Sequence, residues 1–218
     1  MTKKMRIAVL ASGGGTNLQS IIDQQQRGQL AVDIALVISN NPEAKALERA
    51  AHAGLATRCI NHRDFSTREE FDRAVVTELA AAQVELVVLA GFMRILSKVL
   101  LRAYPQRIIN IHPALLPAFP GLNVHQQALT YGAKFSGCTV HIVDDGVDTG
   151  PIIIQAAVPI LAGDSKETLA ARILEQEHRI YPQAIQWFAE GRIKVKDRQV
   201  IVAGAEACPP AQINPPLD

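Results

Sequence analysis

Short apolar segments rich in β-branched residues alternate with longer amphipathic segments over residues 6–89. One of these runs, Leu86 to Leu89, has no polar residue, as expected for a strand covered on both faces of a parallel sheet. The alternation is that of right-handed β-α-β units, in which each helix packs against the sheet that it connects. We therefore predict an α/β fold with a largely parallel central sheet and helices on both faces.

The element boundaries follow from the same pattern. The predicted strands are 6–10, 32–38, 57–60, 86–89, 107–111, 138–143 and 152–157. The predicted helices are 17–27, 43–53, 67–82, 97–103 and 168–190, and the last one is expected to be interrupted or bent at Pro182. A C-terminal hairpin is expected to pair 193–195 with 200–202. No linker divides the chain, so we predict one domain over 1–205 and a disordered, proline-rich tail over 206–218.

Charge and composition argue against several classes of partner. The formal net charge is +1 and no block of Lys and Arg occurs, whereas a protein that binds nucleic acid usually presents a concentrated basic face. No apolar run approaches the ~20 residues that cross a bilayer. The three cysteines are scattered, without a Cys-x-x-Cys pair or zinc-site spacing, as in proteins of a reducing compartment. We expect a cytoplasmic protein that binds neither nucleic acid nor membrane.

A glycine-rich loop, Ser12 to Asn17, joins the first predicted strand to the first predicted helix. Such a loop brings backbone N–H groups and the positive end of a helix dipole to an anion, most naturally a phosphate. A P-loop would need a lysine here, and a dinucleotide fingerprint would need glycine or alanine at Leu18. The alternative is a tight turn without a ligand; three consecutive glycines at this position favour phosphate binding.

Asn110 and His112 lie two residues apart at the end of a predicted strand and therefore on one face of it. Pro113 keeps His112 extended and ends the strand. Because open α/β sheets bind ligands beyond the carboxyl ends of their strands, an imidazole and an amide are expected together at an active-site rim. The alternative is a strand-end histidine satisfied by backbone groups. His141, inside a later strand, is the chief competing histidine.

An acidic loop, Asp144 to Pro151, follows another predicted strand. Its spacing does not match the calcium-binding EF-hand loop, and it is rich in the residues of solvated turns. Alternatively, one aspartate turns inward and stabilises the imidazolium form of His112, which would suit general acid–base chemistry. The residues alone do not choose among Asp144, Asp145 and Asp148.

Four motifs occur together, in this order: Ser12 to Asn17, Ala90 to Leu96, Asn110 to Pro117, and Asp148 to Pro151. In sequence and order they resemble the phosphoribosylglycinamide formyltransferases, folate-dependent enzymes of purine synthesis. The resemblance extends from about Met5 to Arg192. It implies a Rossmann-like formyltransferase fold, 10-formyltetrahydrofolate as cosubstrate, and no metal.

The resemblance also implies roles for individual residues. The family's catalytic asparagine, histidine and aspartate fall on Asn110, His112 and Asp148. The ribonucleotide-binding positions, first the phosphate loop and then a glutamate, fall on Gly15, Thr16, Asn17 and Glu177. The folate-binding positions fall on Arg68, Met93, Arg94, Ile95, Leu96, Asn110, Asp144, Asp145, Gly146, Val147 and Asp148. Leu174 stands where some relatives carry glutamine, and the Leu116–Pro117 bond matches one that is cis in the family.

The implied reaction moves a formyl group from 10-formyltetrahydrofolate to the amine of N1-(5-phospho-D-ribosyl)glycinamide by direct attack. Two related enzymes are alternatives: formyltetrahydrofolate hydrolase and methionyl-tRNA formyltransferase, each expected to carry a further domain. A non-catalytic nucleotide-binding module is a third alternative, but it leaves the catalytic trio without a shared task. Small molecules are the expected partners, with the N-terminal half holding the ribonucleotide and the C-terminal half the folate. We expect a monomer or a homodimer.

Overall fold

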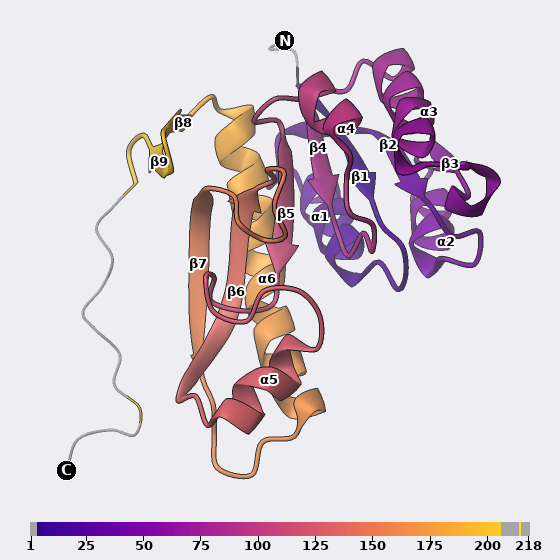
Figure 1. Cartoon of the computed structure of the whole chain (residues 1–218). Helices are drawn as coiled ribbons and strands as arrows, with labels where there is room; N and C mark the ends of the chain where they lie inside the picture. Colours follow the sequence, from indigo (N-terminus) through magenta and orange to yellow (C-terminus); the bar gives the residue numbers. More distant parts are fainter. Residues whose placement is uncertain (1–3, 206–213, 215–218) are drawn as a thin grey trace.

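Seven strands form one sheet in the order β3-β2-β1-β4-β5-β6-β7 (Figure 1). The computed structural model describes residues 4–205 and residue 214. The strands are β1 (Met5–Leu10), β2 (Val32–Ser39), β3 (Thr57–Cys59), β4 (Leu86–Leu89), β5 (Ile108–His112), β6 (Phe135–Ile142) and β7 (Ile152–Pro159). The first five pair in parallel, whereas β6 is antiparallel to both β5 and β7. The predicted, largely parallel sheet is confirmed.

Helices cover both faces of this sheet, and two apolar cores lie between the layers. One core packs under α1 (Thr16–Gln26), α2 (Lys45–His52) and α6 (Lys166–Ala189). The other packs under α3 (Arg68–Ala81) and α4 (Lys98–Ala103). Alternate residues of β1 enter opposite cores: Ile7 and Val9 enter the first, and Ala8 and Leu10 the second. Burial on both faces is the reason that the parallel strands are continuously apolar.

The remaining elements are short. A 3-10 turn, η1 (His62–Asp64), precedes α3, and α5 (Val124–Tyr131) follows the proline-rich loop. The C-terminal hairpin pairs β8 (Ile193–Lys196) with β9 (Gln199–Val202), as predicted. Of the tail over 206–218, only Asn214 lies within the described residues. Among those residues no helix has the length and apolarity needed to cross a membrane.

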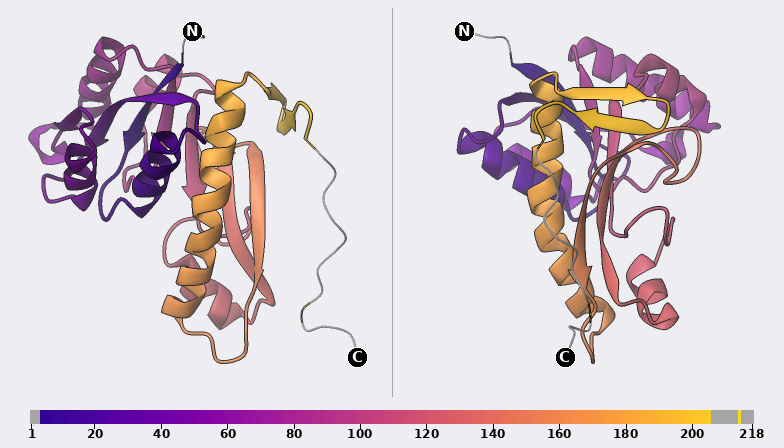
Figure 2. Two further views of the ribbon diagram at one scale, coloured as in Figure 1. Left: turned by 180° about the vertical axis from the view of Figure 1, so that it is seen from behind. Right: turned by 90° about the vertical axis from the view of Figure 1, so that its left-hand side faces the viewer.

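Helix α6 runs alongside β6, β7 and α1 without a break at Pro182, so the predicted interruption is wrong (Figure 2, left). Proline has no N–H to donate to the carbonyl four residues earlier, that of His178. Two side chains of α1 supply the missing donors: Ser20 Oγ and Gln24 Nε2 each lie 3.0 Å from the His178 oxygen. A tertiary contact thus satisfies the carbonyl that proline leaves without a helical partner.

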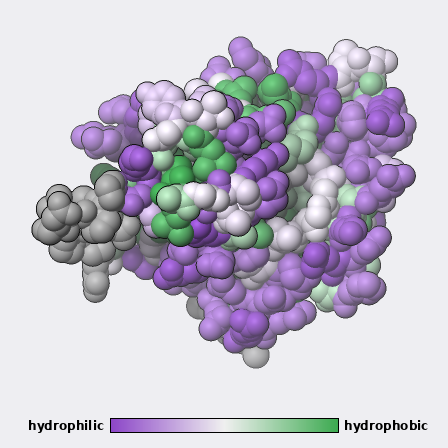
Figure 3. Space-filling view, turned by 90° about the horizontal axis from the view of Figure 1, so that it is seen from below, coloured by the Kyte–Doolittle hydropathy of each residue, from purple (hydrophilic) through white to green (hydrophobic). Residues whose placement is uncertain are grey.

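The parallel strands end together. Leu10 pairs with Leu89, and Leu89 pairs with Asn110, so β1, β4 and β5 reach their carboxyl ends at one edge. The chain leaves β1 toward β2 on one side and returns to β4 on the other, which makes this edge the switch point where such sheets bind ligands. Figure 3 views the molecule from this side, and hydrophobic patches there border a hollow. The glycine loop, segment 90–96 and the end of β5 all converge here.

Candidate active site

The antiparallel partner of β5 completes the face on which Asn110 and His112 lie. Opposite Asn110 stands His141 of β6, and opposite His112 stands Thr139. Ile109 and Ile111 point to the other face, into the core beneath α6. Strand periodicity therefore places the amide and the imidazole together as predicted, and the neighbouring strand adds a second histidine to them.

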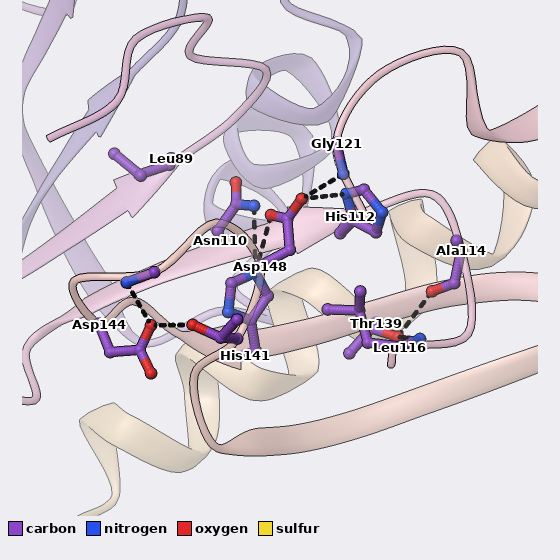
Figure 4. A network of polar contacts seen from close by, with 12 residues as sticks. Leu89, Asn110, His112, Ala114, Leu116, Gly121, Thr139, His141, Asp144 and Asp148 are labelled. Atoms are coloured by element: carbon purple, nitrogen blue, oxygen red, sulfur yellow. Dashed lines mark hydrogen bonds and ion pairs between the residues drawn. The ribbon is translucent and has the colours of Figure 1, made fainter. Parts of the chain in front are cut away.

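Both ring nitrogens of His112 face oxygen atoms, and Figure 4 shows the one that faces Asp148. Nδ1 lies 3.3 Å from Oδ2 of Asp148, and Nε2 lies 2.9 Å from the carbonyl oxygen of Phe119. The side chain is only 5% exposed. A carbonyl accepts and never donates, and an ionised carboxylate does the same. The ring therefore has an oxygen acceptor opposite each of its two nitrogens.

Asp148 is the acidic residue that reaches His112. Its Oδ2 also accepts from the Gly121 amide at 2.9 Å, and its Oδ1 lies 3.6 Å from Nε2 of His141. Burial raises the pKa of the Asp148 carboxyl, but its hydrogen bonds and the charges of the two histidines outweigh burial, so the pKa lies below 3.8. The carboxylate is thus ionised near neutral pH.

The other two aspartates of the loop have different contacts. Asp144 Oδ1 accepts within the loop, from the amide of Gly146 at 3.2 Å and from Oγ1 of Thr149 at 2.6 Å. Asp145 is exposed. The geometry therefore separates Asp148 from Asp144 and Asp145, a distinction that the spacing of the three residues does not contain.

His141 is a site residue that sequence reasoning ranked only as a competitor. Its Nδ1 lies 3.0 Å from the carbonyl oxygen of Ile142, so this nitrogen carries a proton and donates. The other nitrogen, Nε2, lies 3.2 Å from Nδ2 of Asn110 and 3.6 Å from Oδ1 of Asp148. The contact with Asn110 orients its amide and leaves an N–H of it free. The antiparallel pairing of β5 with β6 places His141 opposite Asn110, and the sequence alone does not specify this pairing.

The proline-rich loop is anchored to β6 and β7 before it reaches His112. Thr139 Oγ1 donates to the carbonyl oxygen of Ala114 at 2.7 Å and accepts from the Leu116 amide at 3.1 Å. Gln155 Nε2 donates to the Leu116 carbonyl at 2.9 Å. The Leu116–Pro117 bond is cis, as the resemblance implied. These bonds fix the start of the segment that brings Phe119 to His112 and Gly121 to Asp148.

The glycine loop forms the N-terminus of α1. Gly15 is the N-cap residue, with φ of 71°, and a Cβ on it would lie 2.8 Å from Cα of Ala46. A Cβ on Gly13 or Gly14 would meet nothing within 4 Å. No side chain caps the helix, so its first amides have no intrahelical partner. The fold requires glycine at Gly15, whereas the space beside Gly13 and Gly14 is open.

Asn17 and Glu177 meet beside this loop. Asn17 Nδ2 donates to Glu177 Oε2 at 2.7 Å, while Oδ1 of Asn17 is buried and finds no hydrogen-bond partner within the described chain. Burial raises the pKa of Glu177 above 4.5, although the bond from Asn17 opposes the shift. Cys138 lies near enough for the Glu177 charge to act on it, and burial raises the pKa of its thiol to about 12. That thiol stays protonated and is a poor nucleophile.

The predicted folate segment follows β4 at the same edge. The backbone amide of Met93 donates to Ser12 Oγ at 2.7 Å, which ties this segment to the glycine loop. The side chains of Met93 and Ile95 are 66% and 58% exposed, and Arg94 Nε is buried without a partner among the described residues.

Arg68 stands apart from the other predicted site residues. It is exposed at the start of α3 and makes no hydrogen bond or ion pair with any of them within the described chain. Its link to the site is indirect: the ring of Phe71, one turn further along α3, stacks on Phe92, the residue before Met93. No group of three or more His, Cys, Asp or Glu residues in the described chain is arranged to hold a metal ion.

Comparison with known proteins identifies the family of this chain. The sequence pattern named formyl transferase matches residues 5–185. The chain belongs to the formyl transferase family. The phosphoribosylglycinamide formyltransferase of Escherichia coli is 46% identical over 205 residues, which cover 94% of this chain and 97% of that enzyme.

Other members of the formyl transferase family extend the comparison. The crystal structure of glycinamide ribonucleotide transformylase 1 from Symbiobacterium toebii is 50% identical, with a TM-score of 0.91 over 93% of this chain and 95% of that one. The trifunctional purine biosynthetic protein adenosine-3 of Drosophila melanogaster is 49% identical over 87% of this chain. The match spans only 14% of that longer protein.

Proposed function

We propose that this formyl transferase moves the formyl group of 10-formyltetrahydrofolate to the amine of N1-(5-phospho-D-ribosyl)glycinamide, a reaction of purine biosynthesis. Family membership and the names of relatives that match over nearly their whole length support this substrate pair. The observation that carries the proposal is the contact of Asp148 with His112 beside Asn110 at the carboxyl edge of the sheet. In the proposal, these three residues perform the transfer.

The reaction is a direct exchange of one C–N bond for another. The glycinamide nitrogen attacks the formyl carbon and forms a tetrahedral intermediate whose oxygen carries negative charge. The free N–H of Asn110 and a proton on His112 stabilise that oxygen, and each such donor is typically worth about 3 kcal/mol. The bond between the formyl carbon and N10 then breaks. One proton passes from the attacking amine to N10, through His112 or water.

The contacts of the two ring nitrogens of His112 support its role as a cation in this step. Ionised Asp148 holds the proton on Nδ1, and Phe119 holds the proton on Nε2. The carbonyl of Phe119 occupies the direction in which Nε2 would donate to a substrate oxygen. In the proposed mechanism this carbonyl gives way when the folate binds, so that Nε2–H transfers its hydrogen bond to the developing oxyanion.

The ribonucleotide fits the glycine loop and the acidic residue behind it. The open space at Gly13 and Gly14 and the free amides of α1 suit a phosphate, as helix N-termini do in general. Glu177 suits a ribose hydroxyl, and the unpartnered oxygen of Asn17 provides a further acceptor for the substrate. These contacts support Gly15, Thr16, Asn17 and Glu177 as the residues that bind this substrate.

The folate is proposed to lie between segment 93–96 and the loop 144–148. Exposed apolar side chains of Met93, Ile95 and Val147 suit the pterin and benzoyl rings. A buried Arg94 Nε without a partner favours a ligand acceptor, because an unsatisfied buried donor costs on the order of 1–3 kcal/mol. Arg68, exposed at the start of α3, is proposed to reach the folate from the rim.

Several broader expectations remain proposals. We infer a cytoplasmic enzyme of small molecules, acting as a monomer or a homodimer. The division of labour between an N-terminal ribonucleotide half and a C-terminal folate half is supported by Asn17 on α1 and Asp148 after β6. Glu177 departs from that division, because it lies on α6 and still contacts Asn17.

The test mixes the purified protein with 10-formyltetrahydrofolate and glycinamide ribonucleotide and follows both products by mass spectrometry. We expect the ribonucleotide to gain one formyl group for each folate that loses one. Folate turnover with release of formate and no formylated ribonucleotide would indicate the hydrolase instead. Absence of any turnover would contradict both enzymatic alternatives.

A further inference from the structure

The C-terminal hairpin contacts the loop that carries Asp148. Arg198, in the turn between β8 and β9, donates from Nη2 to the carbonyl oxygen of Thr149 at 2.6 Å. The two residues are 49 positions apart in sequence. Figure 2 (right) shows the hairpin next to the loop between β6 and β7. An element with no part in the proposed reaction thus bonds to the residue that directly follows Asp148.

The loop itself is tightly built. A Cβ on Gly146 would lie 2.0 Å from Oγ1 of Thr149, and one on Gly150 would lie 1.7 Å from the carbonyl oxygen of Ile142. Asp144 joins both sides of the turn through Gly146 and Thr149. The chain closes on itself so narrowly that no side chain fits at either glycine. Its shape therefore depends on a few specific hydrogen bonds.

That shape includes an unfavourable backbone conformation at Asp148 itself. Its φ is 55°, in the left-handed region that residues other than glycine rarely adopt. Such a conformation persists only when surrounding contacts over-determine it. The Gly121 amide and two histidines hold the carboxylate, and Arg198 holds the peptide group that leads away from the next residue. The Asp148 side chain is thus held by one set of contacts, and the backbone that follows Asp148 is held by Arg198.

We propose that Arg198 is a positioning residue of this enzyme, acting through the Thr149 carbonyl to keep Asp148 against His112. The inference rests on the proposed function. Without the guanidinium, the loop samples other conformations, and Asp148 spends less time next to the imidazole. Both kcat and folate binding depend on this loop. The ribonucleotide site around Gly15 and Glu177 does not contact it.

The test compares Arg198→Ala and Arg198→Lys with Lys196→Ala, an exposed lysine of the same hairpin. For Arg198→Ala we expect kcat to fall and the KM for folate to rise, each about threefold to tenfold, as for the loss of one ordinary hydrogen bond. The KM for the ribonucleotide and the melting midpoint stay at wild-type values. Arg198→Lys keeps a cationic donor and recovers most of the loss, and Lys196→Ala behaves as wild type.

The proposal would be overturned by wild-type kcat and folate KM in Arg198→Ala, by an equal loss in Lys196→Ala, or by a rise in both KM values. An effect that grows with the number of glutamates on the folate would also overturn it, because it would indicate direct contact with the folate tail.

Amide hydrogen exchange over 144–150 separates this inference from the proposed function, because it needs no turnover. We expect faster exchange there in Arg198→Ala than in wild type. Unchanged exchange would reject the contact even in an active enzyme. Faster exchange in a protein that transfers no formyl group would reject the function while retaining the contact.

Discussion

His112 stands with an oxygen acceptor at each ring nitrogen, and this arrangement determines what its neighbours must do. Asp148 can hold a proton on Nδ1 only while it is ionised, and its lowered pKa keeps it ionised down to acidic pH. His141 donates from Nδ1 to the Ile142 carbonyl, and this turns its Nε2 toward both Asn110 and Asp148. At the scale of single residues, the site is a chain of hydrogen bonds in which each group sets the orientation of the next.

The first prediction concerns His112 and Asp148. His112→Ala removes the proposed oxyanion donor, and Asp148→Asn removes the charge proposed to hold the imidazolium, so each variant should lose kcat roughly a hundredfold to a thousandfold. His52→Ala, at the exposed end of α2, is the matched control and should keep wild-type kcat. Steady-state kinetics check the rates and circular dichroism checks the fold. A well-folded His112→Ala or Asp148→Asn variant with near-normal kcat would refute the assigned roles.

The second prediction concerns Glu177, whose pKa is raised by burial. A group with a raised pKa in the folded state stabilises the fold fully below its unfolded pKa and loses that contribution as pH rises through the folded pKa. Glutamine carries no charge and still accepts from Asn17. We expect the unfolding free energy of Glu177→Gln to exceed that of wild type by a margin that widens from pH 4 to pH 8.

Denaturant titrations at several pH values measure this margin. In the same variant the KM for the ribonucleotide should rise about tenfold, as for the loss of one hydrogen bond to a charged group. A margin that is constant with pH would show that Glu177 is not destabilised by burial. An unchanged KM would remove Glu177 from the substrate site.

At the scale of elements, the glycine loop contains one glycine that the fold requires, Gly15, and one that the fold does not require, Gly14. Gly15 combines a positive φ with a close approach to Ala46, so Gly15→Ala should destabilise the protein by about 1–3 kcal/mol. Gly14 has neither constraint. We expect Gly14→Ala to keep wild-type stability but to raise the KM for the ribonucleotide, because its Cβ would occupy space in front of the amides. Loss of stability in Gly14→Ala with normal KM would indicate a purely structural loop.

Helix α6 offers a test of how Pro182 is accommodated. The double change Ser20→Ala, Gln24→Ala leaves the His178 carbonyl without a donor. It should lower the free energy of unfolding by on the order of 1–3 kcal/mol. In a Pro182→Ala background, the restored N–H donates to that carbonyl, and the same double change should cost less. Denaturant unfolding of the four proteins gives the coupling energy. Equal costs in both backgrounds would mean that the α1 side chains do not compensate for proline.

For the molecule as a whole, sequence patterns predicted most of the architecture. Continuous apolar runs such as 86–89 identify parallel strands because both faces are buried. Helix α5 was missed, since it begins after Asn123 with φ of 57° and has no side-chain cap. The antiparallel direction of β6 was also not predicted, because a strand's direction depends on where the chain enters the sheet. The first miss comes from the absence of a local capping signal, and the second from a direction that residues elsewhere in the chain decide.

The site was predictable to the same extent. Asn110 and His112 follow from strand periodicity and a proline, both of which are local. Asp148 was distinguished from its neighbours only by family resemblance, because a loop's conformation decides which carboxylate turns inward. His141, Phe119 and Gly121 required the sheet order and the path of the proline-rich loop. Contacts between segments that are distant in sequence depend on tertiary structure, and no short sequence pattern predicts them.

The measurement that tests the central claim most directly is a single turnover with 10-formyltetrahydrofolate labelled with ¹³C in the formyl group. The fate of the label is followed by NMR in wild type and in Asp148→Asn. We predict that wild type delivers the label to the glycinamide nitrogen, and that Asp148→Asn leaves it on the folate over the same time. Label appearing as formate in wild type, or transfer at the wild-type rate in Asp148→Asn, would contradict direct transfer by Asn110, His112 and Asp148.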